Sequence, residues 1–265
     1  MIHYKVVKIG GSMKKGFTLA EGATHAGIFA KKRQVAFTLA EVLITLGIIG
    51  VVAAMTLPAL INNARNKQFE AGLKKSYSVI SQAFEMYQAK TGERATKQLF
   101  VGKKFKDNIM PYFNVLKDCG SGVFYQNGEC MPAGNNPYKT YDGTTGFGIF
   151  ATYFEEGSFI LSDGSLIRIY HQNWGNTNCF IAVDVNGFLK NPNRAGFDVF
   201  VFELTNDGKI LPVGHPDSTY PCNPSLWDGH VQNTCSTKFN NNGSNGISCT
   251  YKALTDKDYF KNLPK

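Results

Sequence analysis

A run of 20 uncharged residues, Val42 to Ile61, constrains this chain more than any other feature of its sequence. At 1.5 Å per residue, a helix of that length spans about 30 Å, which is the thickness of the hydrocarbon core of a bilayer. Lys31, Lys32 and Arg33 precede the run and are expected to stay in the cytoplasm. The sequence therefore predicts one membrane-spanning helix, with the rest of the chain beyond it.

The net charge of +8 does not indicate a nucleic-acid-binding protein. Residues 1–36 hold seven Lys or Arg and one acid, whereas the remainder is nearly balanced, with 21 basic and 19 acidic residues. A balanced remainder has no excess charge for a phosphate backbone. We therefore expect the positive charge to serve targeting, and we expect no specific nucleic-acid partner.

The order of residues around the apolar run argues against an ordinary secretory signal peptide. Such a peptide places its small-residue cleavage site after the apolar run, whereas here the small residue, Ala36, comes before it. Glu41 opens the run, and a carboxylate at the start of a membrane helix is costly unless it has a role. The run is therefore expected to stay in the mature protein.

This region resembles the precursors of type IV pilins and type II secretion pseudopilins, in which a basic leader and a small residue precede Phe-Thr-Leu-x-Glu and a long apolar helix. Here Ala36 is followed by Phe37-Thr38-Leu39-Ala40-Glu41. The resemblance implies cleavage between Ala36 and Phe37 by a prepilin peptidase, methylation of the new amine, and assembly through Glu41. It also implies that Pro58 is the family's helix-kinking proline. Two departures are Ala36, where the family usually has Gly, and the length of the leader.

A second copy of the motif, Phe17-Thr18-Leu19-Ala20-Glu21, follows Gly16 inside the leader. Three positive charges at residues 31–33 come soon after it, and such charges are not held within a bilayer. We interpret this copy as a duplication relic. A regulatory second site and a true start at either Met1 or Met13 remain open.

Beyond Pro58 the helical pattern becomes one-sided. An apolar stripe continues at helical spacing through Leu73, Tyr77, Ile80, Phe84 and Tyr87. Thr91-Gly92 is a stop signal, so one helix is predicted over residues 37–90.

The remaining chain predicts a head built on a sheet. Residues 97–117 are weakly helical, and six strands are then expected at 147–154, 158–162, 165–171, 179–185, 197–204 and 209–213. Tight-turn signals at Asp163-Gly164, Asn186-Gly187 and Asn206-Asp207-Gly208 favour an antiparallel meander. The apolar stripe of the helix would cover one face of this sheet.

The predicted fold class is therefore α+β and pilin-like, with a long N-terminal helix packed on an antiparallel sheet and a disulfide-closed C-terminal loop. We divide the chain into a basic leader, a membrane helix, the amphipathic half of that helix, and a head whose cysteine-rich tail starts at residue 214. These parts cover residues 1–36, 37–61, 62–94 and 95–265.

Six cysteines lie in the C-terminal 150 residues, without the spacing of a zinc site: Cys119, Cys130, Cys179, Cys222, Cys235 and Cys249. Their even number predicts disulfides and an oxidising compartment. A local bridge between Cys119 and Cys130 is sterically reasonable. Among the remaining pairings we favour Cys222 with Cys235 and Cys179 with Cys249. The Asn-rich run at residues 240–246 is expected to be an exposed tip.

No nucleophile elbow, P-loop, dinucleotide fingerprint or H-E-x-x-H motif occurs, so we expect no enzyme activity. One loop carries hard oxygen ligands at Asp184, Asn186 and Asp198, a set that suits calcium and that is similar to the calcium loop of the major type II secretion pseudopilin. Because Asn-Gly turns are common without any metal and the loop is not an EF-hand, a plain turn is the favoured interpretation and calcium the alternative, and no other cofactor is expected.

The expected function is that of a pilin-like or pseudopilin subunit with its N-terminus in the cytoplasm and its head in the periplasm. Gly47 and Gly50 offer small surfaces for close helix packing. The expected partners are a prepilin peptidase, other subunits and an inner-membrane assembly platform. A minor filament-tip adhesin and a signal-anchored periplasmic protein that never polymerises are the alternatives. Whether a pilus or a secretion system is served remains open.

Overall fold

The computed structural model describes residues 37–96, 105–121, 130, 138–143, 146, 157–172, 178–218, 235–238 and 243–264. The chain divides into two units, residues 1–51 and 52–265, and the helix α1 runs through the boundary between them. Several predicted features lie outside the described residues: the leader with Ala36, the strand at 147–154, Cys222 and the run 240–242.

The helix α1 (Leu39–Thr91) is one element of 53 residues that continues through Pro58. It ends at Gly92, whose φ of 75° places it in the left-handed region and whose amide donates to the carbonyl of Gln88 at 2.9 Å. Such a glycine is a frequent helix terminator. The helix predicted over 37–90 is therefore confirmed, within two residues at each end.

Six antiparallel strands form one sheet in chain order, which confirms the predicted meander. The strands are β1 (Val115–Asp118), β2 (Gly157–Leu161), β3 (Leu166–Gln172), β4 (Asn178–Asp184), β5 (Val199–Leu204) and β6 (Ile210–Pro212).

The weak helix predicted at 97–117 is correct only in part. Residues 105–112 form α2 (Phe105–Ile109) and the 3-10 helix η2 (Met110–Tyr112), and the chain then enters β1. The end of the prediction was wrong because β1 gains its hydrogen bonds from β2, a strand some 40 residues downstream.

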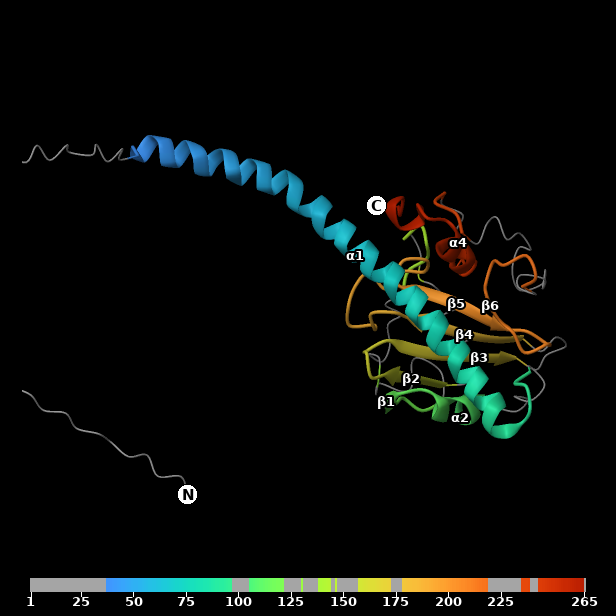
Figure 1. Cartoon of the computed structure of the whole chain (residues 1–265). Coiled ribbons are helices and arrows are strands. Elements are labelled where there is room, and N and C mark those ends of the chain that lie inside the picture. Colours follow the sequence, from blue (N-terminus) through green and yellow to red (C-terminus); the bar gives the residue numbers. More distant parts are fainter. Residues whose placement is uncertain are drawn as a thin grey trace, which may run out of the picture. The chain divides into compact units, whose positions relative to one another are not determined.

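The amphipathic half of α1 crosses one face of this sheet (Figure 1). Leu73, Ile80 and Phe84 are buried there, and the ring of Tyr77 stacks on Phe202 of β5 with centroids 5.4 Å apart. The predicted stripe is therefore the packing face of the helix.

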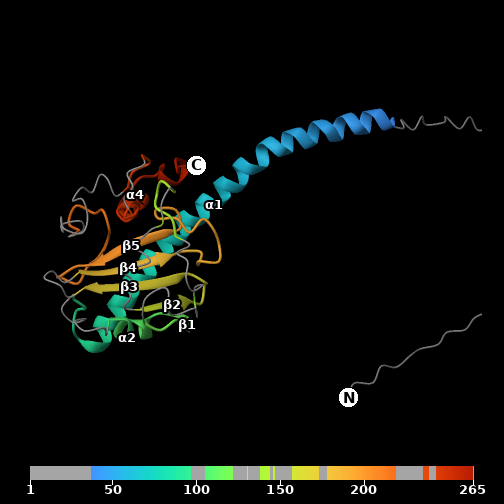
Figure 2. The ribbon, with the colours of Figure 1, turned by 180° about the vertical axis from the view of Figure 1, so that it is seen from behind.

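Apolar side chains are also buried on the opposite face of the sheet, which is turned to the viewer in Figure 2. Val199 and Val201 of β5 belong to a second apolar cluster, together with Ile247 of the C-terminal tail. Every residue of β5 is buried, so this strand lies at the centre of two packed layers.

The C-terminal tail is more ordered than the predicted loop. It forms α4 (Cys249–Thr255) and the 3-10 helix η4 (Tyr259–Lys261), and the side chains of Tyr259 and Phe260 are buried in the main core. Residues 244–246 are also buried, so the prediction of an exposed tip is wrong for that part of the run.

One disulfide joins Cys119 to Cys130, as expected from their short separation. A second joins Cys235 to Cys249, which contradicts both favoured pairings, Cys222 with Cys235 and Cys179 with Cys249. The physical reason is the side chain of Asn245. Its Oδ1 accepts from the amide of Ser236 at 2.9 Å and its Nδ2 donates to the carbonyl of the same residue at 2.9 Å, which brings the two cysteine segments together.

Candidate functional site

The N-terminus of α1 is closed by a capping box formed by Thr38 and Glu41. The carboxylate oxygen Oε2 of Glu41 accepts from the amide of Thr38 at 2.8 Å and from its hydroxyl at 2.9 Å. In return, the amide of Glu41 donates to the hydroxyl of Thr38 at 3.2 Å. A Thr-x-x-Glu sequence makes this reciprocal pattern, which satisfies amides that the first helical turn leaves open. Among the described residues, no hydrogen bond reaches the other oxygen of Glu41, Oε1.

The first part of α1, up to Ile61, is apolar and exposed. Its 18-residue window of highest mean hydropathy, at 2.3, has no buried residue, and its length suffices to cross a membrane. Fourteen large apolar side chains of this region are exposed: Phe37, Leu39, Val42, Leu43, Ile44, Leu46, Ile48, Ile49, Val51, Val52, Met55, Leu57, Leu60 and Ile61. The space beside Gly47 and Gly50 is open, since a Cβ built on either would meet no atom within 4 Å.

The β4–β5 loop, residues 185–198, holds the second candidate site. Asp184 accepts from the hydroxyl of Tyr138 at 2.8 Å and from the amide of Gly187 at 2.9 Å. Asp198 accepts from the amides of Asn193 at 2.9 Å and Arg194 at 2.7 Å. Asn186-Gly187, which is a tight-turn signal in the sequence, lies near the start of this longer loop between β4 and β5.

Burial raises the pKa of both carboxyl groups in this loop. For Asp184 the neighbouring charge of Asp198 raises the pKa further, while the hydrogen bond from Tyr138 opposes the shift. For Asp198, the hydrogen bonds from the amides of Arg194 and Asn193 oppose the upward shift of the pKa. Two carboxylates that are both desolvated and close enough to repel one another favour a bound proton or a cation.

Two amide oxygens of the same loop, Oδ1 of Asn186 and Oδ1 of Asn193, are buried and have no hydrogen-bond partner among the residues that the structure describes. The side chain of Asn193 is 4% exposed. In the part of the chain that the structure describes, no cluster of three or more His, Cys, Asp or Glu side chains is placed to hold a metal. A cation in this loop would therefore need amide oxygens beside the two carboxylates.

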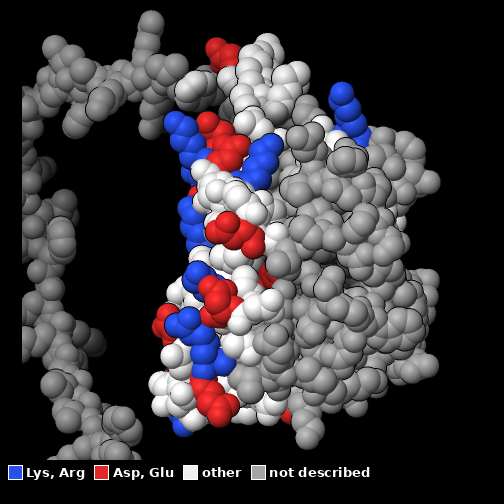
Figure 3. All heavy atoms as spheres, turned by 90° about the vertical axis from the view of Figure 1, so that its right-hand side faces the viewer, with Lys and Arg blue, Asp and Glu red and all other residues white. Residues whose placement is uncertain are grey.

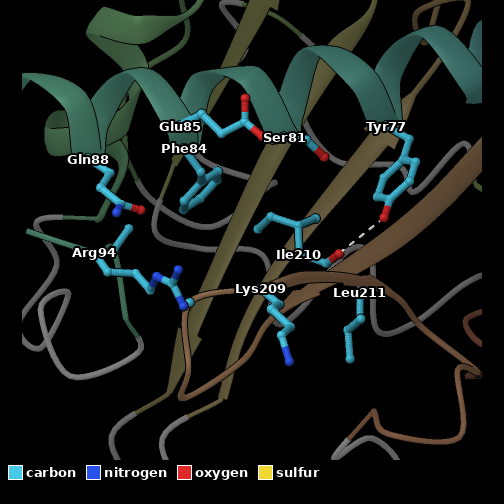
Figure 4. Close-up of a pocket in the computed structure, with 11 residues that line it drawn as sticks. Tyr77, Ser81, Phe84, Glu85, Gln88, Arg94, Lys209, Ile210 and Leu211 are labelled. Carbon is cyan, nitrogen blue, oxygen red and sulfur yellow. Dashed lines mark hydrogen bonds between the residues drawn. The ribbon is translucent and has the colours of Figure 1, made fainter.

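A groove of about 380 Å³ lies between α1 and the β5–β6 hairpin (Figure 4). Ser81 and Glu85 reach it from the helix, Lys209 and Leu211 from the hairpin, and the hydroxyl of Tyr77 donates to the carbonyl of Ile210 at 3.4 Å. None of the residues that the sequence singles out as processing, assembly or calcium-binding residues lines it.

Charge is mixed on the face of the molecule shown in Figure 3, where Lys and Arg side chains alternate with Asp and Glu side chains. Ion pairs between described residues include Lys74 with Glu70 at 2.5 Å and Lys75 with Asp163 at 2.7 Å. The described atoms of this face therefore do not gather into a surface of one sign.

Two residues that contact the candidate sites, Tyr138 beside Asp184 and Thr38 beside Glu41, were not among the predicted site residues. Tyr138 lies 46 residues from Asp184, and nothing local indicates that contact. Thr38 was recognisable, because Thr and Glu three residues apart before an apolar run are the signature of a capping box.

Residues 31–57 match the family model described as the prokaryotic N-terminal methylation motif, which is the signature of type IV pilins and pseudopilins. No match was found among the curated proteins or the solved structures. The motif supports a pilin-like or pseudopilin-type substrate, and together with the apolar helix it fits a signal-anchored envelope protein.

Proposed function

We propose that this protein is a structural subunit of a type IV pilus or a type II secretion pseudopilus. The exposed apolar segment Phe37–Ile61 carries the proposal, because a helix with no buried residue must be covered either by lipid or by other helices. As a precursor it would span the inner membrane with its head in the periplasm. After cleavage, the same segment would pack against its copies in a filament.

Two observations bear on the alternatives. The adhesin alternative depended on an exposed Asn-rich tip, and in the described part of that run residue 243 is half-buried and residues 244–246 are buried. The anchored, non-polymerising alternative gives no role to the open glycine surfaces at Gly47 and Gly50. Both observations favour a polymerising subunit.

Processing tests this proposal first. A peptidase that cuts before an apolar helix needs a small residue at the cut, so Ala36→Gly is expected to be cleaved normally and Ala36→Trp to remain as the precursor. The measurement is N-terminal sequencing of the membrane form, followed by the yield of each variant in sheared filaments. A mature chain that starts at Phe37 supports the proposal, whereas a start at Phe17 or a retained leader in the native chain contradicts it.

We also propose that the β4–β5 loop binds calcium. Asp184 and Asp198 would supply the carboxylates, and Asn186 and Asn193 the amide oxygens. Two observations support this proposal. The two amide oxygens are buried and have no hydrogen-bond partner among the described residues. Burial also destabilises the ionised forms of the two carboxyl groups. These are the hard oxygen donors that calcium prefers, and its two positive charges would balance both carboxylates.

A calcium titration of the full chain tests the second proposal. Binding only to the folded state is expected to raise the melting temperature by about 5 °C or more at millimolar calcium. The matched controls are Asp198→Asn, which is expected to lose the shift, and Asp207→Asn in the β5–β6 turn, which is expected to keep it. An unchanged melting temperature of the native chain would mean that the loop is a plain turn.

A further inference from the structure

Leu189, at the tip of the β4–β5 loop, is 84% exposed, more than any other large apolar side chain that the structure describes. Outside the apolar segment Phe37–Ile61, only Met86 and Leu116 join it as exposed large apolar residues of the described chain. Exposing a large apolar side chain to water is unfavourable, so the exposure of Leu189 needs a physical reason.

The exposure of Leu189 does not come from a loosely held loop. The amide of Lys190 donates to the carbonyl of Gly187 at 3.0 Å, and the side chain of Asn186 donates to the carbonyl of Lys190 at 3.0 Å. The side chain of Asn193 donates to the carbonyl of Phe188 at 2.8 Å. These hydrogen bonds hold the backbone on both sides of Leu189. The side chain of Leu189 is therefore exposed by the conformation of the loop.

Leu189 is also part of a larger apolar surface. Together with Phe188, Ile160 and Leu166 it lines a groove of about 230 Å³ whose walls are almost wholly apolar. Phe188 packs against the second core cluster, which anchors the tip. The apolar surface of this loop thus continues from the core to the solvent.

The tip lies close to the point where α1 leaves the predicted membrane span. Lys190 and Asn191 line a second groove, of about 350 Å³, with Arg65 and Phe69 of α1. Arg65 is four residues beyond Ile61, or about 6 Å along the helix axis. The headgroup layer on each side of the hydrocarbon core is about 5 to 7 Å thick, so this part of the head reaches that layer.

The charge beside the tip is positive. Arg65, Lys67 and Lys190 are exposed, and no described carboxylate forms an ion pair with them. Two acids lie nearby: Glu70 follows Arg65 along α1, and Asp163 lines the groove beside Arg65 and Lys190. They pair instead with Lys74 and Lys75. Cations near the end of a membrane span attract anionic lipid headgroups.

We propose that the tip of the β4–β5 loop docks on the surface of the bilayer that holds α1, with Leu189 among the lipids and Arg65, Lys67 and Lys190 on anionic phospholipid headgroups. The head of the membrane-anchored subunit is then oriented by a second contact with the membrane, besides the helix. This inference needs the membrane span but not filament assembly, so it goes beyond the proposed function.

Photo-cross-linking of the full chain in vesicles tests the contact. The photoreactive residue p-benzoylphenylalanine is introduced at position 189 or, as a matched control, at position 116, where Leu116 is another exposed leucine on the edge strand β1. The vesicles contain phosphatidylcholine with phosphatidylglycerol, and alkaline extraction checks that each variant is inserted. Mass spectrometry then measures lipid adducts, which are expected at position 189 and not at 116.

The charge dependence is tested with Lys190→Gln and with vesicles of phosphatidylcholine alone. Lys190→Gln is expected to lower the yield of lipid adducts at position 189 by about fivefold, the effect of one cationic charge near an anionic surface. Vesicles of phosphatidylcholine alone are expected to lower it further, because they remove the attraction of all three cations. Equal lipid adducts at positions 189 and 116 would overturn the proposal, and so would adducts that do not respond to phosphatidylglycerol. Cross-links to a second copy of the chain as the main product would also overturn it and would assign Leu189 to a contact between subunits.

Discussion

Replacing Glu41 with alanine is expected to leave the subunit inserted in the membrane and to remove most of it from filaments. An unpaired carboxylate in the apolar layer costs on the order of 2 to 3 kcal/mol, so its loss does not hinder insertion. Cleavage before Phe37 would create an amine, and methylation keeps its positive charge. In a filament that amine can meet the Glu41 of a neighbouring subunit, where an apolar surrounding leaves the attraction little screened.

The capping box makes this role geometrically specific. Oε2 of Glu41 is held by Thr38, while Oε1 accepts no hydrogen bond from the described residues and remains available to a neighbour. Losing the ion pair is expected to lower the yield in sheared filaments by roughly tenfold or more, which corresponds to about 1.4 kcal/mol. The measurement is the ratio of subunit in sheared filaments to subunit in the membrane.

Two further variants separate charge from geometry. Glu41→Asp keeps the charge but shortens the side chain, so its yield is expected to be intermediate. Thr38→Ala keeps the charge of Glu41 and removes both hydrogen bonds of the Thr38 hydroxyl. Losing such a cap costs about 1 kcal/mol in a typical helix, so the loss of yield is expected to be smaller than for Glu41→Ala. Normal incorporation of Glu41→Ala would exclude the ion pair.

The long helix and the meander follow from local patterns. The apolar stripe at helical spacing identifies the face of α1 that packs on the sheet, and short apolar runs between turn signals identify β2 to β6. These elements were predictable because each depends on residues that are neighbours in the sequence.

The cysteine pairing and the ordered tail depend instead on contacts between distant segments. Asn245 binds Ser236 and thereby selects Cys235 as the partner of Cys249. The hydroxyl of Tyr259 donates to the carbonyl of Gly196 at 2.8 Å, across 63 residues. Neither contact has a local signature, so the sequence alone left the choice among pairings open.

In the β4–β5 loop, too, some features follow from the local sequence and others depend on contacts with distant segments. Asp184, Asn186 and Asp198 meet in one loop, as their spacing suggests. The two features that support calcium, the orphaned oxygen of Asn193 and the burial of both carboxylates, appear only once Tyr138 and the second core cluster cover the loop.

A substitution at Gly196 is expected to have the second large effect, on the stability of the head, because three segments that are distant in the sequence meet at this residue. A Cβ on this glycine would lie 2.7 Å from Cδ2 of Tyr141, 2.7 Å from the hydroxyl oxygen of Tyr259 and 3.0 Å from Cβ of Cys249. Its φ of 75° is also in the region that side chains disfavour. Gly196→Ala therefore combines backbone strain with overpacking, and we expect it to lower the free energy of unfolding by about 3 kcal/mol.

Gly92 is the matched control, since it has the same φ of 75° but no atom within 4 Å of an added Cβ. Gly92→Ala should show the backbone strain alone, about 1 kcal/mol. Urea denaturation of the full chain in detergent, followed by near-ultraviolet circular dichroism, measures both variants. Equal losses for the two would mean that the Tyr141, Tyr259 and Cys249 segments move apart easily. A larger loss for Gly196→Ala would mean that the C-terminal tail, with its Cys235–Cys249 bridge, is packed firmly enough to hold the β4–β5 loop in place.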